Sequence, residues 1–225
     1  MCLVIFIFKL KCGKRKVRLL SLLEENKQSL TPSENPINIR FRSLIGSGSF
    51  GVVWKASFED QSLVAVKMCS ADRVERWEKE KAILTSRGLV HTNIIKMIGW
   101  EVRNIKAQTA LLLIFEFVEK GDLRSHLTQN TLSAESMMFL VKSLCSGVAF
   151  LHSSRDCHGE YKTPIAHRDM KSSNVLFSES RGCIIADFGL AVSLEKSNMA
   201  SWLENKVQVG ELIRVSFSKL HLTMI

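Results

Sequence analysis

A cluster of glycines, Gly46-Ser47-Gly48-Ser49-Phe50-Gly51, narrows the possible folds of this chain more than any other segment. Glycines at this spacing let a backbone loop approach a polyphosphate, because no Cβ atom stands in the way. The same spacing occurs in dinucleotide-binding folds, but there a helix follows the glycines and points its N-terminus at the pyrophosphate. Here the run Val52-Val53-Trp54-Lys55 follows, which predicts a strand. The cluster is therefore expected to be a phosphate-binding turn between two strands.

The pattern of apolar residues predicts an α+β fold. Strands are expected at residues 41–45, 52–54, 63–68, 94–102 and 110–118. A helix is expected to start after the N-cap Asp72 and to end near Arg87. These elements predict a mostly antiparallel sheet with one helix.

After residue 119 the pattern becomes mainly helical. A short helix is expected to open at Gly121 and Asp122, and Ser133 is expected to cap a longer one. The apolar face of the longer helix is expected to carry Met137, Leu140, Val141, Leu144, Val148 and Leu151. Two short apolar runs, 175–177 and 183–186, predict a small hairpin.

The composition excludes several classes of protein. The 225 residues are 46% hydrophobic and 24% charged, which argues against a disordered or fibrous chain and suffices for one large core or two small lobes. The formal net charge is +9, but part of the excess is a local cluster between Lys9 and Arg18, and the other charges are mixed. No nucleic-acid partner is therefore expected.

The cysteines indicate neither a disulfide framework nor a zinc site. They form no CxxC pair and no Cys/His run with zinc-ligand spacing. Free, mostly buried thiols of an intracellular chain are expected. The six are Cys2, Cys12, Cys69, Cys145, Cys157 and Cys183.

The chain starts with a short apolar run, residues 1–8 (MCLVIFIF), which the basic cluster follows directly. A spanning helix needs about 20 apolar residues, so this run cannot cross a bilayer alone. One interpretation is the end of a membrane span with its positive cytoplasmic flank, and the other is an apolar leader without function. We favour the first, because it explains both features. Residues 21–38 are polar, carry Pro32 and Pro36, and indicate a linker.

Lys67 lies in the otherwise apolar run Val64-Ala65-Val66-Lys67. A lysine on a strand is usually solvated, but a buried ammonium needs an acid beside it. The inward face of the predicted helix supplies Glu80, between Trp77 and Leu84. An ion pair between Lys67 and Glu80 is therefore expected, with the lysine placed to meet nucleotide phosphates.

The strongest local signal is His167-Arg168-Asp169-Met170-Lys171-Ser172-Ser173-Asn174, followed thirteen residues later by Asp187-Phe188-Gly189. Asp169 is suited to accept or orient the proton of an attacking hydroxyl, and Lys171 to steady a transferring phosphate. Asn174 and Asp187 are candidate Mg²⁺ ligands, because this ion prefers oxygen ligands and keeps some of its waters. The order and spacing of all these motifs together favour a single phosphoryl-transfer site.

From about residue 41 to residue 194 the chain resembles the eukaryotic protein kinases. Residues 45–56 (IGSGSFGVVWKA), 119–123 (EKGDL) and 147–152 (GVAFLH) resemble the tyrosine-kinase-like group. The polar insert at 153–163, the run PIAHRD after it, and the segments KSSNVL and ADFGLA are similar to type II receptors of the TGF-β and activin superfamily. A lysine two residues after Asp169 is typical of serine/threonine kinases.

The resemblance implies a bilobal protein-kinase fold: an N-lobe of antiparallel sheet plus one helix at 39–118, and an incomplete helical C-lobe at 119–210. It implies ATP and Mg²⁺ (or Mn²⁺) as cofactors. The implied catalytic residues are Lys67, Glu80, Asp169 and Lys171, and the implied metal ligands are Asn174 and Asp187. The implied ATP-binding residues are Ile45, Gly46, Ser47, Gly48, Ser49, Phe50, Gly51, Val53, Ala65, Lys67, Glu116, Val118 and Leu176.

The resemblance also assigns two apolar features. Phe115 aligns with the gatekeeper behind the adenine, where it replaces the small residue usual in this family. An apolar spine is expected to link the lobes through Leu84, Met97, His167 and Phe188.

The end of the chain departs from the family. Residues 206–210 (KVQVG) resemble the activation-segment run GQVGT, but residues 211–225 form a divergent tail with no A-P-E motif, and no proline follows Pro164. The chain is therefore expected to be a partial gene model or a truncated splice product.

Three functional hypotheses follow. In the first, the parent protein is a single-pass plasma-membrane receptor, with 1–8 as the remnant of its span and 9–38 as a basic juxtamembrane linker. It would bind an extracellular TGF-β/activin-like ligand through a missing ectodomain and would phosphorylate a type I receptor kinase. In the second, this chain is a non-catalytic, dominant-negative fragment with weak or no ATP binding. In the third, it derives from a soluble kinase of the tyrosine-kinase-like group.

Overall fold

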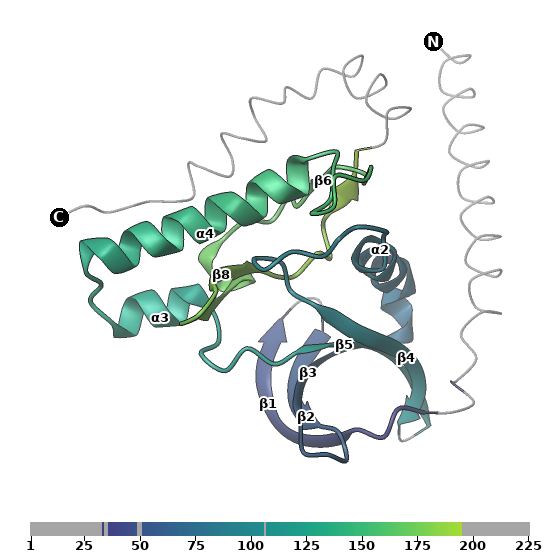
Figure 1. Ribbon diagram of the computed structural model, residues 1–225. Helices are drawn as coiled ribbons and strands as arrows, with labels where there is room; N and C mark the ends of the chain where they lie inside the picture. Colours follow the sequence, from purple (N-terminus) through teal and green to yellow (C-terminus); the bar gives the residue numbers. More distant parts are fainter. Residues whose placement is uncertain (1–32, 34–35, 49–50, 106, 195–225) are drawn as a thin grey trace, which may run out of the picture.

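The computed structural model describes residues 33, 36–48, 51–105 and 107–194, which form two adjoining lobes (Figure 1). The first lobe contains β1 (Arg40–Gly48), β2 (Gly51–Ser57), β3 (Leu63–Ser70), the 3₁₀ turn η1 (Ala71–Arg73), α2 (Val74–Leu84), β4 (Met97–Ile105) and β5 (Gln108–Glu116). The second contains α3 (Leu123–Gln129), α4 (Ala134–His152), β6 (Ile165–Ala166), the 3₁₀ turn η2 (Ser172–Asn174), β7 (Val175–Ser178), β8 (Gly182–Ile185) and β9 (Val192–Ser193). This confirms the predicted α+β, bilobal fold.

The strands of the first lobe form one antiparallel sheet in the order β1-β2-β3-β5-β4. All five predicted strands are present, but β4 and β5 are displaced from the predicted 94–102 and 110–118. The displacement of β4 arises because Ile94 and Ile95 pair with the other lobe: Ile94 bridges Ile185, and the Ile95 N–H donates to Ile185 O at 2.9 Å. A bulge between Met97 and Gly99 then starts the regular ladder with β5.

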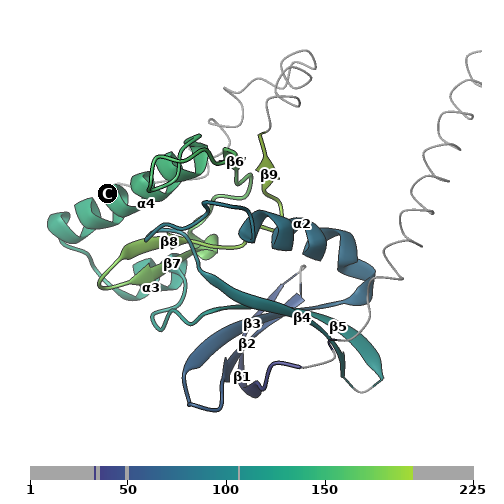
Figure 2. The same cartoon turned by 45° about the vertical axis from the view of Figure 1, so that its right-hand side comes forward.

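Helix α2 covers one face of this sheet (Figure 2). The prediction that Asp72 caps it was wrong. Asp72 lies inside η1, where its carboxylate accepts a hydrogen bond from the Ser70 hydroxyl, and the N-cap position of α2 is Arg73. The helix ends at Leu84 rather than near Arg87, with Thr85 as the C-cap.

The two faces of the sheet bury separate apolar clusters, because successive side chains of a strand point to opposite faces. On β5, Leu111, Leu113 and Phe115 belong to the first cluster, and Ala110, Leu112 and Ile114 to the second. The first cluster contains Trp77 of α2 and continues into the second lobe, where it includes Phe188. A continuous core therefore joins the lobes beneath the site described below.

The segment that enters β1 is fastened to the edge strand β4. The Ser33 N–H donates to Val102 O at 2.9 Å. Ile37 is held at both backbone groups: its N–H donates to Glu101 Oε2 at 3.3 Å, and its carbonyl accepts from Arg103 Nη2 at 2.6 Å. Glu101 is 1% exposed and is paired with Arg103 at 2.8 Å. Two residues near the C-terminal end of the predicted linker, Ser33 and Ile37, are thus bonded to the edge strand of the sheet.

Ser133 caps α4 as predicted, since its hydroxyl accepts from the Ser136 N–H at 3.1 Å. The predicted apolar face was partly wrong, because Met137 and Val141 are 37% and 48% exposed. The buried stripe instead includes Ser143 and Gly147. A Cβ atom at Gly147 would lie 2.9 Å from Ile185 Cδ1, so the close approach of β8 requires small residues there.

The predicted hairpin is present, since β7 and β8 pair antiparallel. No disulfide occurs among the described residues, but the prediction of mostly buried thiols was only half right there. Cys69 and Cys183 are buried, and Cys145 and Cys157 are exposed. Burial raises the pKa of the Cys69 thiol to about 11, so this thiol stays protonated at neutral pH.

Of the described helices, α4 alone has the length and apolar composition that a membrane span requires. Core helices meet the same criterion, and α4 packs against β8 at Gly147. The predicted span remnant at 1–8, the basic cluster, the segment 206–210 and the tail 211–225 lie outside the described residues.

Candidate active site

Gly46 and Gly48 lie at the end of β1 and Gly51 begins β2, while Ser49 and Phe50 lie outside the described residues. Gly51 adopts a φ of +128°, and a Cβ atom there would lie 2.3 Å from Met68 O. Only glycine fits that position. A Cβ atom at Gly48 would meet nothing within 4 Å, which leaves open space beside the turn. Val53, opposite Gly46, faces Lys67 in the register of β2 and β3.

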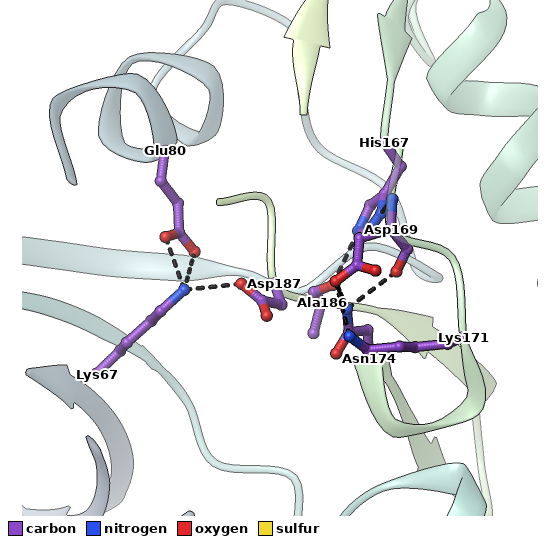
Figure 3. Close-up of polar contacts among 8 residues, drawn as sticks. All are labelled: Lys67, Glu80, His167, Asp169, Lys171, Asn174, Ala186 and Asp187. Atoms are coloured by element: carbon purple, nitrogen blue, oxygen red, sulfur yellow. Dashed lines mark hydrogen bonds and ion pairs between the residues drawn. The ribbon is translucent and has the colours of Figure 1, made fainter. Parts of the chain in front are cut away.

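Lys67 is the centre of a buried group of charges (Figure 3). Its Nζ atom donates to Glu80 Oε1 and Oε2 at 2.8 Å and 2.7 Å, and to Asp187 Oδ1 at 2.8 Å. Lys67 and Glu80 are 8% and 2% exposed. Strand β3, helix α2 and the segment after β8 therefore converge on one ammonium. The contact with Asp187 joins the lobes, and the sequence analysis did not anticipate it.

The environment sets the protonation of these groups. Burial alone would lower the pKa of Lys67, but the Glu80 and Asp187 carboxylates together raise it above its ordinary value. Burial alone would raise the pKa of Asp187, but the Lys67 ammonium and a hydrogen bond from the Gly189 backbone hold it below its usual range. Lys67 is therefore a cation and Asp187 an anion at neutral pH.

A second group of polar residues surrounds Asp169. Its Oδ2 atom accepts from Lys171 Nζ and from Asn174 Nδ2, both at 2.8 Å. The Asn174 amide also donates to the Asp169 carbonyl at 2.9 Å. Within the described part of the chain, no group donates to Asp169 Oδ1.

His167 holds the backbone between the two groups. Its Nε2 atom lies 2.9 Å from Ala186 O, and its Nδ1 accepts from the Asp169 N–H at 3.3 Å. Those partners require a neutral ring with the proton on Nε2. His167 thus links the residue before Asp187 to Asp169 itself. Asp187 lies between Lys67 and these residues in Figure 3.

Backbone strain marks the same place. Arg168 and Asp187 adopt φ angles of +67° and +60°, a region that non-glycine residues seldom occupy. Each such residue costs on the order of 1–3 kcal/mol, and such conformations concentrate at functional sites.

The donor set suits a divalent cation. The Asn174 amide nitrogen is used by Asp169, which leaves its Oδ1 atom as an oxygen ligand. Asp187 supplies an ionised carboxylate. Mg²⁺ commonly takes one or two protein oxygens and completes its shell with phosphate oxygens and water. No group of three or more His, Cys, Asp or Glu side chains that could hold a metal occurs in the described ranges.

The remaining predicted positions surround the end of β5. Ala65 is the Cα partner of Phe115, and Val64 that of Glu116. Ala65 and Leu176 both pack against the first apolar cluster, from opposite lobes, and Val118 belongs to it. Ile45 is 48% exposed near the glycine turn. The structure thus brings Ala65, Leu176 and Val118 to the same cluster, of which Ile45 is not a member.

The expected apolar spine is partly visible. His167 and Phe188 meet edge-to-face, with ring centroids 4.9 Å apart. Leu84 and Met97 pack against the same cluster as Phe188. Phe115, opposite Met97 in the sheet, is buried at 8% exposure.

One ion pair between the lobes, at the end of β5, was not predicted from the sequence. Arg181, in the turn between β7 and β8, donates to both carboxylate oxygens of Glu116 at 3.1 Å and 2.9 Å. An arginine in a polar turn carries no sequence signal for such a contact.

The chain matches known proteins along most of its length. The protein kinase domain model matches residues 39–210. TGF-beta receptor type-2 of Rattus norvegicus is 34% identical over 202 residues, which cover 84% of this chain and 36% of that protein. Activin receptor type-2B of Xenopus laevis is 39% identical over 150 residues, covering 66% of this chain and 29% of that protein. The chain thus spans about a third of the length of these relatives. It belongs to the protein kinase domain family and resembles the type 2 receptors of TGF-beta and activin.

Proposed function

We propose that this domain transfers the γ-phosphoryl group of ATP to serine or threonine hydroxyls of a protein substrate. The single observation that carries the proposal is the Lys67 ammonium, shared by Glu80 and Asp187 within one buried site. Phosphoryl transfer depends on positioning and on stabilising charge, and a fixed cation of this kind supplies both.

Each residue has a proposed role. Lys67 binds nucleotide phosphates, and Glu80 fixes its position. Asp169 orients the attacking hydroxyl through Oδ1 and takes its proton, while Lys171 neutralises charge on the transferring group. Asn174 and Asp187 hold Mg²⁺ or Mn²⁺, which when bound neutralises the phosphate oxygens. The glycine turn covers the phosphates, and the base lies between Ala65, Val53 and Leu176, against the backbone of Glu116 and Val118.

The experiment measures Mg·ATP binding by calorimetry and phosphate transfer to a generic serine/threonine protein substrate. We expect Lys67→Arg to weaken ATP binding and Asp169→Asn to leave binding intact while lowering turnover by about 10²–10⁴-fold. Transfer that persists in Asp169→Asn would contradict the catalytic role, and loss of folding is checked by thermal melting of each variant.

We further propose that the longer protein is a single-pass plasma-membrane receptor of type II character, whose substrate is a type I receptor kinase. The supporting observation is the likeness to two relatives whose names call them type 2 receptors. Its ligand would be TGF-β- or activin-like. The transcript upstream of Met1 tests this: a full span and a cysteine-rich extracellular domain are expected, and a soluble kinase of the same group would lack both.

A second candidate function is that of a binding fragment without phosphate transfer. The observation that favours it is an apolar surface on α4, where Met137, Met138, Phe139 and Val141 are 37–54% exposed. Exposed apolar patches often mark sites where another protein binds. Transfer of phosphate by purified 1–225, lost on Asp169→Asn, would rule this candidate out.

A further inference from the structure

An ion pair between Arg181 and Glu116 joins the two lobes at the end of β5, and further hydrogen bonds fix each of the two residues. Arg181 reaches from the turn between β7 and β8 to Glu116, the last residue of β5. Its Nη1 and Nη2 atoms donate to Glu116 Oε1 and Oε2 at 3.1 Å and 2.9 Å. The side chains are 29% and 23% exposed. A bidentate ion pair of this kind fixes the relative orientation of the two side chains as well as the distance between them.

The Glu116 carboxylate is fixed from a second side. Its Oε1 atom also accepts from the Lys96 N–H at 3.0 Å, and the Glu116 N–H donates to Lys96 O at 3.0 Å. Residue 96 immediately precedes β4. The side chain and the backbone of Glu116 are therefore both bonded to Lys96, and Arg181 adds a bond from the other lobe.

Arg181 is fixed from its own side as well. Its carbonyl accepts from Asn93 Nδ2 at 2.8 Å, and the same amide nitrogen donates to Cys183 O at 2.8 Å. Asn93 is 6% exposed. Gly182, with a φ of +71°, follows in the turn, where a Cβ atom would lie 2.3 Å from Ser143 Oγ. These contacts therefore fix the backbone of the turn from which the Arg181 side chain extends.

We propose that Arg181 is a positioning residue for the nucleotide base, and that it acts through Glu116. The pair sets where the backbone of residues 116–118 lies relative to the second lobe. This inference rests on the proposed function, in which that backbone receives the adenine. Lys67 governs the phosphates from a separate position, so base and phosphates are controlled by different ion pairs.

The segment after β5 and the β7–β8 hairpin also make contacts that do not involve Arg181. The role of Arg181 can therefore be separated from the general stability of the domain. The Phe177 N–H donates to Gly121 O at 2.9 Å, and Asp122 bridges Leu176. These contacts remain when the Arg181 side chain is removed. The same segments also carry an exposed ion pair, Lys120 Nζ to Glu179 Oε1 at 2.7 Å, with side chains 49% and 72% exposed. That pair is a matched control.

The test measures the affinity of the 1–225 chain for three probes by calorimetry: Mg·ATP, adenosine, and inorganic tripolyphosphate with Mg²⁺. Arg181→Met should weaken binding of ATP and adenosine by the same factor, about 3–10-fold, and leave tripolyphosphate unchanged. Glu116→Gln should have a similar effect, and the double variant should be no weaker than either single one. Arg181→Lys, which keeps the charge but loses the bidentate contact, should recover part of the affinity.

The controls decide between explanations. Lys120→Met and Glu179→Gln should leave all three affinities unchanged. Three results would overturn the positioning role while leaving the proposed function intact. These are an equal loss of affinity for tripolyphosphate, additive losses for Arg181→Met and Glu116→Gln, and no loss of affinity in either variant. Failure of the unaltered chain to bind ATP and adenosine would overturn both. If Arg181→Met does not melt cooperatively, Arg181→Lys and Glu116→Gln carry the same test.

Discussion

The ammonium of Lys67 donates to both carboxylate oxygens of Glu80, at 2.8 Å and 2.7 Å, and both side chains are almost fully buried. Asp187 approaches the same ammonium from the other lobe. Gly189 leaves room for this arrangement, because a Cβ atom there would lie 3.3 Å from Asp187 Oδ1 and 3.4 Å from Glu80 Oε2. The position of α2 relative to the second lobe is therefore set by a shared cation.

Removing that cation should destabilise the chain. Lys67→Met leaves the buried Glu80 carboxylate and the partly exposed Asp187 carboxylate without their partner, so we expect the free energy of unfolding to fall by about 3 kcal/mol. Adding Glu80→Leu should restore part of the stability, because one uncompensated charge is replaced by an apolar group. Neither variant should bind Mg·ATP. Urea denaturation and calorimetry give the two quantities.

The control is on the same helix. Glu78→Gln breaks the more exposed pair with Lys81 at 2.7 Å and should change stability by no more than about 0.5 kcal/mol. Equal destabilisation by Glu78→Gln and Lys67→Met would show that burial of the charge is not the cause.

The Lys67–Glu80 pair could be predicted because both residues interrupt apolar patterns, one on a strand and one on the inward face of a helix. Asp187 was assigned to a metal, and its contact with Lys67 could not be foreseen, since 120 positions separate them and only the lobe arrangement brings them together. The contact of Arg181 with Glu116 could not be predicted from the sequence either, because it too depends on the arrangement of the lobes. Local motifs carry the chemistry, whereas contacts between lobes depend on the assembled fold.

The apolar face of α4 shows a different limit. Periodicity selected the large residues, but β8 approaches closely enough that Ser143 and Gly147 occupy the buried stripe. Ser143 Oγ also accepts from the Cys183 N–H at 2.9 Å, which satisfies a buried donor. Small and polar residues at a close contact look like exposed residues in a hydrophobicity pattern.

Phe115 should restrict the space behind the nucleotide base. It is 8% exposed and lies opposite Ala65 and Met97 in the sheet. We expect Phe115→Thr to admit adenine-like inhibitors with a bulky substituent, raising their affinity at least about 10-fold, while the cavity lowers stability by about 3 kcal/mol. Competition against Mg·ATP measures the affinity.

A second buried phenylalanine gives the comparison. Phe177 belongs to another apolar cluster, which it forms with Leu123, Leu140, Val175 and Cys183, so Phe177→Leu should lower stability without changing inhibitor preference. The prediction fails if the two variants shift inhibitor affinity alike.

The hydrogen bonds of Glu101 and Arg103 to the Ile37 backbone should stabilise the segment that enters β1. Arg103→Met leaves the Glu101 carboxylate buried without its charged partner, so unfolding should become easier by about 3–5 kcal/mol. Exchange of the Ile37 amide hydrogen should accelerate more than exchange in β2 or β3. Mass-spectrometric hydrogen exchange and urea denaturation measure these effects.

The exposed pair of Lys120 with Glu179 provides the reference for a surface charge. Lys120→Met should leave the urea midpoint and the Ile37 exchange rate unchanged. Uniform acceleration of exchange in Arg103→Met, without a local excess near Ile37, would contradict this role of the hydrogen bonds.

His167 should make stability depend on pH in the mildly acidic range. Burial is the main cause that lowers the pKa of His167; Lys171 acts in the same direction, and Asp187, Asp169 and the Ala186 carbonyl oppose it. Because the folded-state pKa is below the unfolded value of about 6.5, the unfolded chain binds the proton more readily. Stability contributed by the neutral ring is therefore present above that value and is lost as the pH falls towards the folded-state pKa.

The slope of the free energy of unfolding against pH distinguishes His167 from other histidines. Each such group contributes at most about 1.4 kcal/mol per pH unit, and burial also lowers the pKa values of His91 and His152. Urea denaturation at pH 7.5, 6.5 and 5.5 should show a smaller decline for His167→Gln than for the unaltered chain. The difference should disappear above pH 7, apart from a constant offset. Parallel curves for the two proteins down to pH 5.5 would mean that His167 is not held neutral between Ala186 and Asp169.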